Sequence, residues 1–422
     1  MEKELYDKYI EALHEELVPA LGCTEPIALA YASALARKEL GAIPDHITAL
    51  CSGNVIKNVK GVTVPNSDNQ KGIKAAVILG ALGGNPDKKL EVLTDICKED
   101  ILQSKQLEPT DYCRVELAEG VEHLYICIEA QHGLEQVRVE IIGSHTNVVS
   151  IEKNGKQILG FRDISHAQGY ASQYGFMNFE GILHFTEEAH CKDVSSLLEM
   201  QINYNSRIAE EGLRKSFGAN TGSTLLDIYG NDLATRARAK AAAGSDARMS
   251  GSDLAVVINS GSGNQGITVS LPVIEYAQDM GCDIDKLYRA LLLSNLTAIY
   301  IKSRIGSLSA FCGAVSAGAG SSAGITYLLG GTWLQIKKAV SNTIAIASGV
   351  ICDGAKPSCA AKVALSVDAA IIASRMALSN GNYRGGEGII MDDIEATINN
   401  VVRLGKDGMK ETDIEIINMM IR

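Results

Sequence analysis

The stretch KLYRALLLSNLTAIYIK, residues 286–302, decides the fold of the larger part of this 422-residue chain. Its apolar residues occupy most faces of a helix, and such a helix is stable in water only when other helices surround it. Helical periodicity recurs in residues 194–213, 333–349 and 360–378. We therefore expect residues 181–422 to form one large all-helical domain.

The first half of the chain has a different residue pattern, with short runs of β-branched and apolar residues separated by Gly, Asn and Pro. Four runs predict strands: ITALCSGNVI (47–56), DYCRVELA (111–118), EHLYICIEA (122–130) and EQVRVEIIGS (135–144). The Ala-rich residues 71–82 predict a helix that lies on this sheet. Residues 46–180 are therefore expected to form a smaller α+β domain, with a linker around residues 160–190.

Two further helices are predicted in residues 1–45. Apolar residues recur four apart at Leu5, Tyr9, Leu13 and Leu17, which is one helical stripe. A second helix runs through IALAYASALARKEL and is ended by a glycine in a C′-like position. We expect this helix pair to pack on the helical domain, so that the whole chain has an α+β fold class.

Composition excludes several partners. A net charge of −11 and a pI near 5.3 argue against nucleic acid, because phosphate-binding surfaces need clustered Lys and Arg. The charged N-terminus is not a signal peptide, and the uncharged residues 305–336 are too rich in Gly and Ser for a membrane span. We expect a cytoplasmic protein with reduced cysteines, a small-molecule substrate and no membrane partner. A homodimer is left open.

Two cysteines flank the loop Cys352-Asp-Gly-Ala-Lys-Pro-Ser-Cys359. Asp353 and Gly354 predict a turn, and Ser358 is a candidate N-cap for a following helix. Cys359 would then lie in the first helical turn, where free N–H groups favour a thiolate and an anionic iron–sulfur centre. Cys312 lies among small residues in SAFCGA. Buried, unligated thiols are the alternative interpretation, since the spacing contains no CxxC pair.

Five segments carry a resemblance to a known family: LGCTEP (21–26), SGNVIKNVKGVTVPN (52–66), SGSGNQG (260–266), FCGA (311–314) and ICDGAKPSCAAK (351–362). Over nearly its whole length the chain resembles the iron–sulfur L-serine dehydratases. It is more similar still to the L-cysteine desulfidases and the bacterial proteins grouped with them.

The resemblance implies a [4Fe-4S] cluster on Cys312, Cys352 and Cys359, whose order and separation match the family's three ligands. Residues 181–422 would then be the catalytic, cluster-binding domain. The resemblance also implies that Cys23, in the GCTEP-type motif, is the proton acceptor. From the residues alone, Cys23 precedes a helix start that would lower the pKa of its thiol, and an ordinary buried thiol is the alternative.

Two departures separate the chain from the serine dehydratases. Only Gly143-Ser-His145-Thr is reminiscent of their Ser-His-Thr motif, and the chain ends in Met-Ile-Arg422 where they can end in a cysteine that reaches the cluster. Both favour a cysteine desulfidase.

Other candidate substrate-binding residues each have a simpler interpretation. Ser52 and Asn54 end a predicted strand and could form a plain turn. Asn264 belongs to a Gly-rich segment that could bind a substrate carboxylate or a phosphate, or could only connect two helices. Arg304 could pair with a carboxylate, although most arginines are solvated. His145 is a second acid–base candidate or a satisfied histidine at a strand end.

The expected function is a lyase that eliminates sulfide from L-cysteine, giving pyruvate and ammonia. L-Serine dehydration is the first alternative. A pyridoxal-phosphate lyase is another, although no lysine lies in the expected Schiff-base setting. A non-catalytic iron–sulfur redox sensor is the alternative from a different class.

Overall fold

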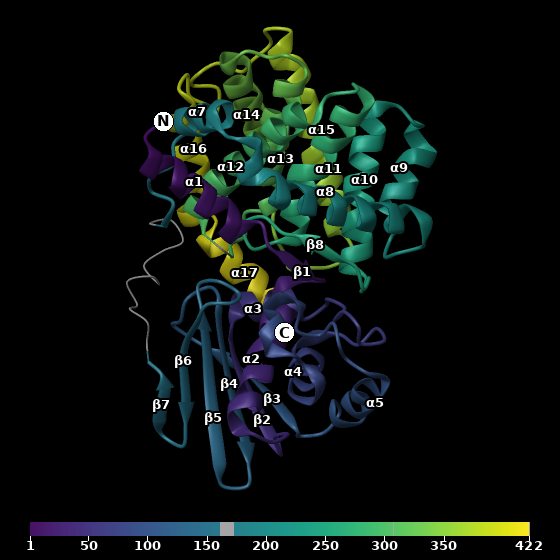
Figure 1. The fold of residues 1–422 in the computed structure, drawn as a ribbon, viewed down its shortest axis with the longest axis vertical. Helices are drawn as coiled ribbons and strands as arrows, with labels where there is room; N and C mark the ends of the chain where they lie inside the picture. Colours follow the sequence, from purple (N-terminus) through teal and green to yellow (C-terminus); the bar gives the residue numbers. More distant parts are fainter. Residues whose placement is uncertain (161–172, 307, 422) are drawn as a thin grey trace.

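The computed structural model describes residues 1–160, 173–306 and 308–421. It has the expected α+β fold, with a large helical part and a smaller part built on one mixed sheet (Figure 1). The N-terminus lies at the helical part, whereas the C-terminus reaches the top of the smaller part.

The helical part is built by α7 (Phe179–Glu188), α8 (Cys191–Arg214), α9 (Thr221–Tyr229), α10 (Leu233–Met249), α11 (Gly263–Asp279), α12 (Ile284–Ile305), α13 (Gly313–Leu328), α14 (Trp333–Ala347), α15 (Cys359–Leu378), α16 (Ile394–Arg403) and α17 (Lys410–Ile421). Helix α12 contains the mostly apolar stretch 286–302, and it packs on α11 and α13. Small residues permit this approach, since a Cβ at Gly320 would lie 2.3 Å from the Ser294 carbonyl. None of the described helices is both long enough and apolar enough to cross a membrane.

The sheet has six strands in the order β3-β2-β4-β5-β6-β7, in which only β2 and β3 are parallel. The strands are β2 (His46–Ser52), β3 (Cys113–Ala118), β4 (Tyr125–His132), β5 (Glu135–Ile142), β6 (Val148–Lys153) and β7 (Lys156–Leu159). The predicted helix is α4 (Gly72–Gly83). The shorter helical elements of this part are α3 (Gly53–Val59), η1 (Pro86–Glu91) and α5 (Lys98–Leu107). Strand β2 ends before Asn54, because Ser52 caps α3 by accepting a hydrogen bond from the Val55 N–H.

The two N-terminal helices do not pack together on the helical part. Helix α1 (Lys3–Glu16) packs there, against α8 and α12. Helix α2 (Thr24–Leu40) instead packs on β4, β5 and α4, so this part of the prediction is wrong. The reason is close backbone packing, since a Cβ at Gly80 of α4 would lie 2.3 Å from the Ala30 carbonyl.

A short two-stranded sheet was not expected from the sequence. Strand β1 (Pro19–Leu21) pairs antiparallel with β8 (Ala255–Val257), which interrupts the otherwise helical second half. Three residues are too few to show a strand period. Of the predicted linker, residues 161–172 lie outside the described residues, and the remainder includes α7.

The C-terminal helix joins the two parts. Helix α17 packs on α3, where the Lys57 ammonium lies 2.6 Å from the Asp413 carboxylate, and both side chains are buried. Asn54 also donates to Asp413, at 2.5 Å. A buried charge that loses its partner is costly, so this pair ties the end of the chain to the smaller part.

We predict that Asp413→Ala lowers the free energy of unfolding by about 3–5 kcal/mol, because it leaves the Lys57 ammonium buried and unpaired. The double variant Lys57→Met/Asp413→Leu should recover much of this loss, and Glu4→Ala, at an exposed pair, should have little effect. Urea unfolding measures all three. An Asp413→Ala protein as stable as the wild type would show that the pair does not hold α17 in place.

Candidate active site

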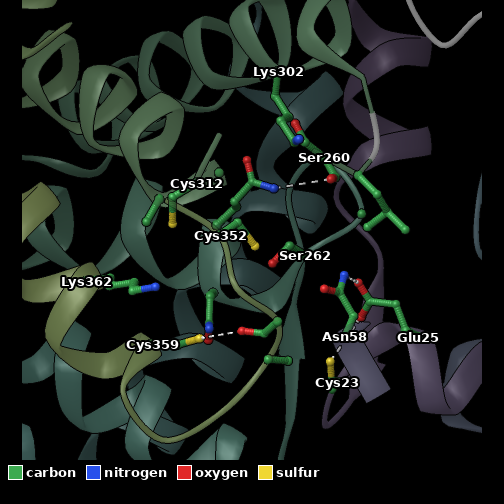
Figure 2. A pocket seen from close by; sticks show the side chains of 18 of the residues that line it. Cys23, Glu25, Asn58, Ser260, Ser262, Lys302, Cys312, Cys352, Cys359 and Lys362 are labelled. Carbon is green, nitrogen blue, oxygen red and sulfur yellow. Dashed lines mark hydrogen bonds between the residues drawn. The ribbon is translucent and has the colours of Figure 1, made fainter. Parts of the chain in front are cut away.

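Segments from both parts of the chain converge on one pocket (Figure 2). Its lining includes Cys312, Cys352 and Cys359 from the helical part. Cys23, Glu25, Asn58 and His145 line it from the first half of the chain. Strand pairing between β1 and β8 explains this meeting, because it places the start of α2 beside the Gly-rich segment that follows β8.

Two neighbouring segments carry the three cysteines. Phe311 and Ile351 form an antiparallel bridge, and the Cys352 N–H donates to the Ala310 carbonyl at 2.7 Å. Cys312 is the residue before α13, and Cys359 is the first residue of α15. Gly354 allows the intervening loop to turn at a φ of +93°, where its Cα approaches the Lys57 carbonyl too closely for a Cβ. The loop is thus packed directly on α3.

Burial dominates the electrostatics of these cysteines. It raises the pKa of the Cys312 thiol to about 12, with a further contribution from Cys352, and it raises the pKa of Cys359. The expectation that the helix start favours a Cys359 thiolate is therefore wrong for the unligated thiol, and Ser358 makes no side-chain cap. Metal binding would favour the thiolate forms of these cysteines, because a bound metal deprotonates its thiol ligands.

Two lysines border the same end of the pocket. Lys302 is buried, which lowers the pKa of its ammonium to about 8 although Cys352 and Cys312 oppose the shift. Lys362 donates to the Ile351 carbonyl at 2.8 Å and pairs with Asp353. Both cations lie where they would offset the charge of a thiolate-bound centre.

The donor set fits a cluster better than a single metal ion. Among the described residues, no three His, Cys, Asp or Glu side chains are placed to bind one ion. A [4Fe-4S] cluster binds each cysteine to a different iron, so its ligands are spread around a larger group. Three thiols, two cations and small residues such as Gly313 and Ala355 border this end of the pocket and provide that setting.

The opposite end of the pocket is organised by Glu25. Its carboxylate accepts from the Cys23 thiol at 3.0 Å and from the Asn58 amide at 2.8 Å, and His145 Nε2 lies 3.9 Å away. Burial alone would raise the pKa of Glu25, but His145, Cys23 and Asn58 together hold it well below its usual range. Glu25 is therefore a buried carboxylate that stays charged.

The surroundings of Cys23 favour its protonated form. Burial first, and the Glu25 carboxylate second, raise the pKa of its thiol well above the usual range, whereas the Arg248 guanidinium acts in the opposite direction. The predicted lowering by the helix start is therefore wrong, because a single helix end does not offset full burial next to a negative charge.

Two of the five predicted substrate-binding residues line the pocket. His145 packs on Gly261, whose Cβ would lie 3.2 Å from its ring. Asn264 accepts a hydrogen bond from the Ser245 hydroxyl at 3.1 Å.

The other three lie elsewhere, with their polar groups in use. Ser52 caps α3 and donates to the His123 carbonyl, and Asn54 binds Asp413. Arg304 donates to the Tyr300 hydroxyl at 2.9 Å and to Asn399. These three residues do not belong to the candidate site, because they do not line the pocket and their polar groups are already bonded elsewhere.

Several polar pocket residues were not singled out from the sequence, among them Glu25, Asn58, Arg248, Lys302 and Lys362. Glu25, Asn58 and Lys362 lie within the segments that carry the family resemblance, so their motifs could have suggested them. Arg248 and Lys302 lie in helices with no local signal, and only the fold places them here.

Comparison with known proteins agrees with the resemblance. Residues 87–418 match the family described as serine dehydratase alpha chain. The UPF0597 protein of Lachnoclostridium phytofermentans is 50% identical over 99% of this chain and 100% of its own. The UPF0597 protein of Desulfitobacterium hafniense is 49% identical over 99% of this chain and 97% of its own. The UPF0597 protein of Finegoldia magna is 47% identical over 98% of this chain and 99% of its own. The chain therefore belongs to the serine dehydratase alpha chain family.

Proposed function

We propose that this protein is a [4Fe-4S]-dependent L-cysteine desulfidase, with Cys312, Cys352 and Cys359 as cluster ligands and Cys23 as proton acceptor. The observation that carries the proposal is that these four cysteines, from three distant segments, line the same pocket. Membership of the serine dehydratase alpha chain family supports a lyase. When bound, the cluster supplies a Lewis-acidic iron for the leaving group of the substrate.

The remaining chemistry belongs to residues at the Glu25 end of the pocket. The thiol of Cys23 donates to Glu25 at 3.0 Å, and Arg248 favours its thiolate form. Cys23 acts as proton acceptor in the thiolate form, and its proton leaves to solvent before the reaction, because Glu25 stays charged. The thiolate then takes the Cα proton. The Cα–H electrons form the Cα–Cβ double bond as the Cβ–S bond breaks and sulfide leaves. The enamine product tautomerises and hydrolyses to pyruvate and ammonia in water.

L-Serine dehydration is the second candidate, because the matching family is described by that activity. The pocket geometry is the same for both substrates, and only the leaving group differs. His145 lies in the pocket as the alternative base, 3.9 Å from Glu25.

Anaerobic turnover tests the proposal. Cluster-loaded protein should release pyruvate and sulfide in equal amounts from L-cysteine, with a larger kcat/KM than for pyruvate release from L-serine. A larger value for L-serine would favour the dehydratase. A fully loaded protein that releases pyruvate from neither amino acid would refute both lyase activities. A non-catalytic iron–sulfur redox sensor would then be the remaining candidate.

Replacing Cys312, Cys352 or Cys359 by Ala should abolish cluster binding, because three thiolates hold the cluster without a fourth. Iron and sulfide content and the visible absorbance of anaerobically purified protein measure this. Cys282→Ala, at a cysteine outside the pocket, is the matched control and should load normally. Full occupancy in any of the three variants would remove that cysteine from the ligand set.

Cys23→Ala should keep the cluster and lose nearly all elimination, on the order of 10²-fold or more, as for loss of a positioned base. Cys23→Ser should restore little, since a hydroxyl is a poor base near neutral pH. The readouts are initial pyruvate release and iron content on the same samples. Normal turnover by Cys23→Ala would make Cys23 a structural thiol and His145 the next base to test.

A further inference from the structure

Arg248 is the most unusual side chain in the pocket lining. It lies on α10 with only 2% of its surface exposed, and it ranks among the largest fully buried side chains of the described chain. Its Nε has no hydrogen-bond partner, and within the described ranges no carboxylate pairs with its guanidinium. A buried, unpaired cation is costly, so this residue is prepared for an anion that arrives from outside.

A second cationic feature lies against Arg248. Helix α11 begins at Gly263, and a Cβ on Gly263 would lie 2.2 Å from Arg248 Nε, so the guanidinium packs on the first turn of the helix. The residue before the helix, Ser262, makes no side-chain cap. The positive end of the helix dipole and the guanidinium thus favour an anion at the same place.

The neighbouring carboxylate of Glu25 has the opposite charge. Cys23 connects the two, since its thiol donates to Glu25 and its titration responds to Arg248. The pocket lining therefore includes an anionic group, Glu25, and a cationic group, Arg248, together with the proposed proton acceptor. An α-amino acid has the same pattern, with an ammonium and a carboxylate on the carbon that loses its proton.

We propose that Arg248, with the start of α11, binds the α-carboxylate of the substrate, and that Glu25 binds its α-ammonium. This deepens the proposed function and rests on it for the identity of the pocket as a substrate site. The substrate class is then a zwitterionic α-amino acid, and 2-hydroxy acids and simple amines should bind more weakly. The side chain of the substrate points to the cysteine end of the pocket.

Binding of L-alanine tests the carboxylate contact, because this amino acid has both charged groups and no leaving group. Calorimetric titration of the full-length wild type, with and without cluster, should show binding. Arg248→Met should weaken it by about 10- to 100-fold, the range expected for charge-assisted hydrogen bonds. Arg248→Lys should be intermediate, because an ammonium cannot form the bidentate contact.

The matched control is Arg238→Lys, which changes another arginine of α10 that pairs with Asp368 outside the pocket. It should bind L-alanine as the wild type does. Absence of L-alanine binding by the wild type, or an Arg248→Met affinity within about threefold of it, would overturn the carboxylate assignment.

L-Lactate, which replaces the ammonium by a hydroxyl, tests Glu25. The wild type should prefer L-alanine to L-lactate, and Glu25→Gln should lose that preference. Arg248→Met should weaken both ligands by a similar factor. A Glu25→Gln protein that keeps the full preference would contradict the ammonium assignment.

Thermal unfolding without ligand separates binding from a structural role. Arg248→Met should have a Tm equal to or above that of the wild type, because it removes an unpaired buried charge. A clear fall in Tm would show that Arg248 serves the fold. Since binding needs no turnover, a protein that binds L-alanine through Arg248 and releases no pyruvate would uphold this inference while refuting the proposed elimination.

Discussion

Pairing of β1 with β8 is the contact on which the pocket depends. Each strand has three residues, yet their pairing joins segments more than two hundred residues apart in the sequence. The Ile258 N–H continues the ladder to the Val18 carbonyl at 3.0 Å, and the Thr24 hydroxyl donates to the Gly261 carbonyl at 2.9 Å. These bonds place Cys23 and the Gly-rich segment in the same wall of the pocket. Cys23 thereby lines the same pocket as Cys312, Cys352 and Cys359.

Charge is distributed unevenly along the pocket that this pairing closes. Lys302 and Lys362 border the thiols at one end, whereas Glu25 and Arg248 lie at the other. Burial works against charged groups, and among the described residues no carboxylate pairs with the buried Arg248. Such an arrangement lowers stability and is expected where a charged cofactor and a charged substrate complete the pairing. Bound ligands would therefore stabilise the fold as well as react in it.

Residue patterns predicted most of the fold and the cysteine end of the site. The mostly apolar stretch of α12 and the short runs of β-branched residues in β2 to β5 each favour one type of element. Helix α2 was assigned to the wrong neighbour because it is buried on almost every face, so its period does not identify a partner. Arg248 was missed for a similar reason, since nothing local distinguishes a buried arginine from a solvated one. Ser52 and Asn54 were polar at a strand end, as expected, but capping of α3 by Ser52 and a hydrogen bond from Asn54 to Asp413 of the C-terminal helix explain them.

In the proposed function, three cysteines hold a cluster whose remaining iron meets the substrate. Mössbauer spectroscopy of anaerobic, ⁵⁷Fe-loaded protein tests it most directly, because the signal of one iron is resolved when its ligands differ from those of the others. Adding L-cysteine or L-serine should shift the signal of one iron and leave the others unchanged. A spectrum of equivalent irons that no amino acid perturbs would contradict it.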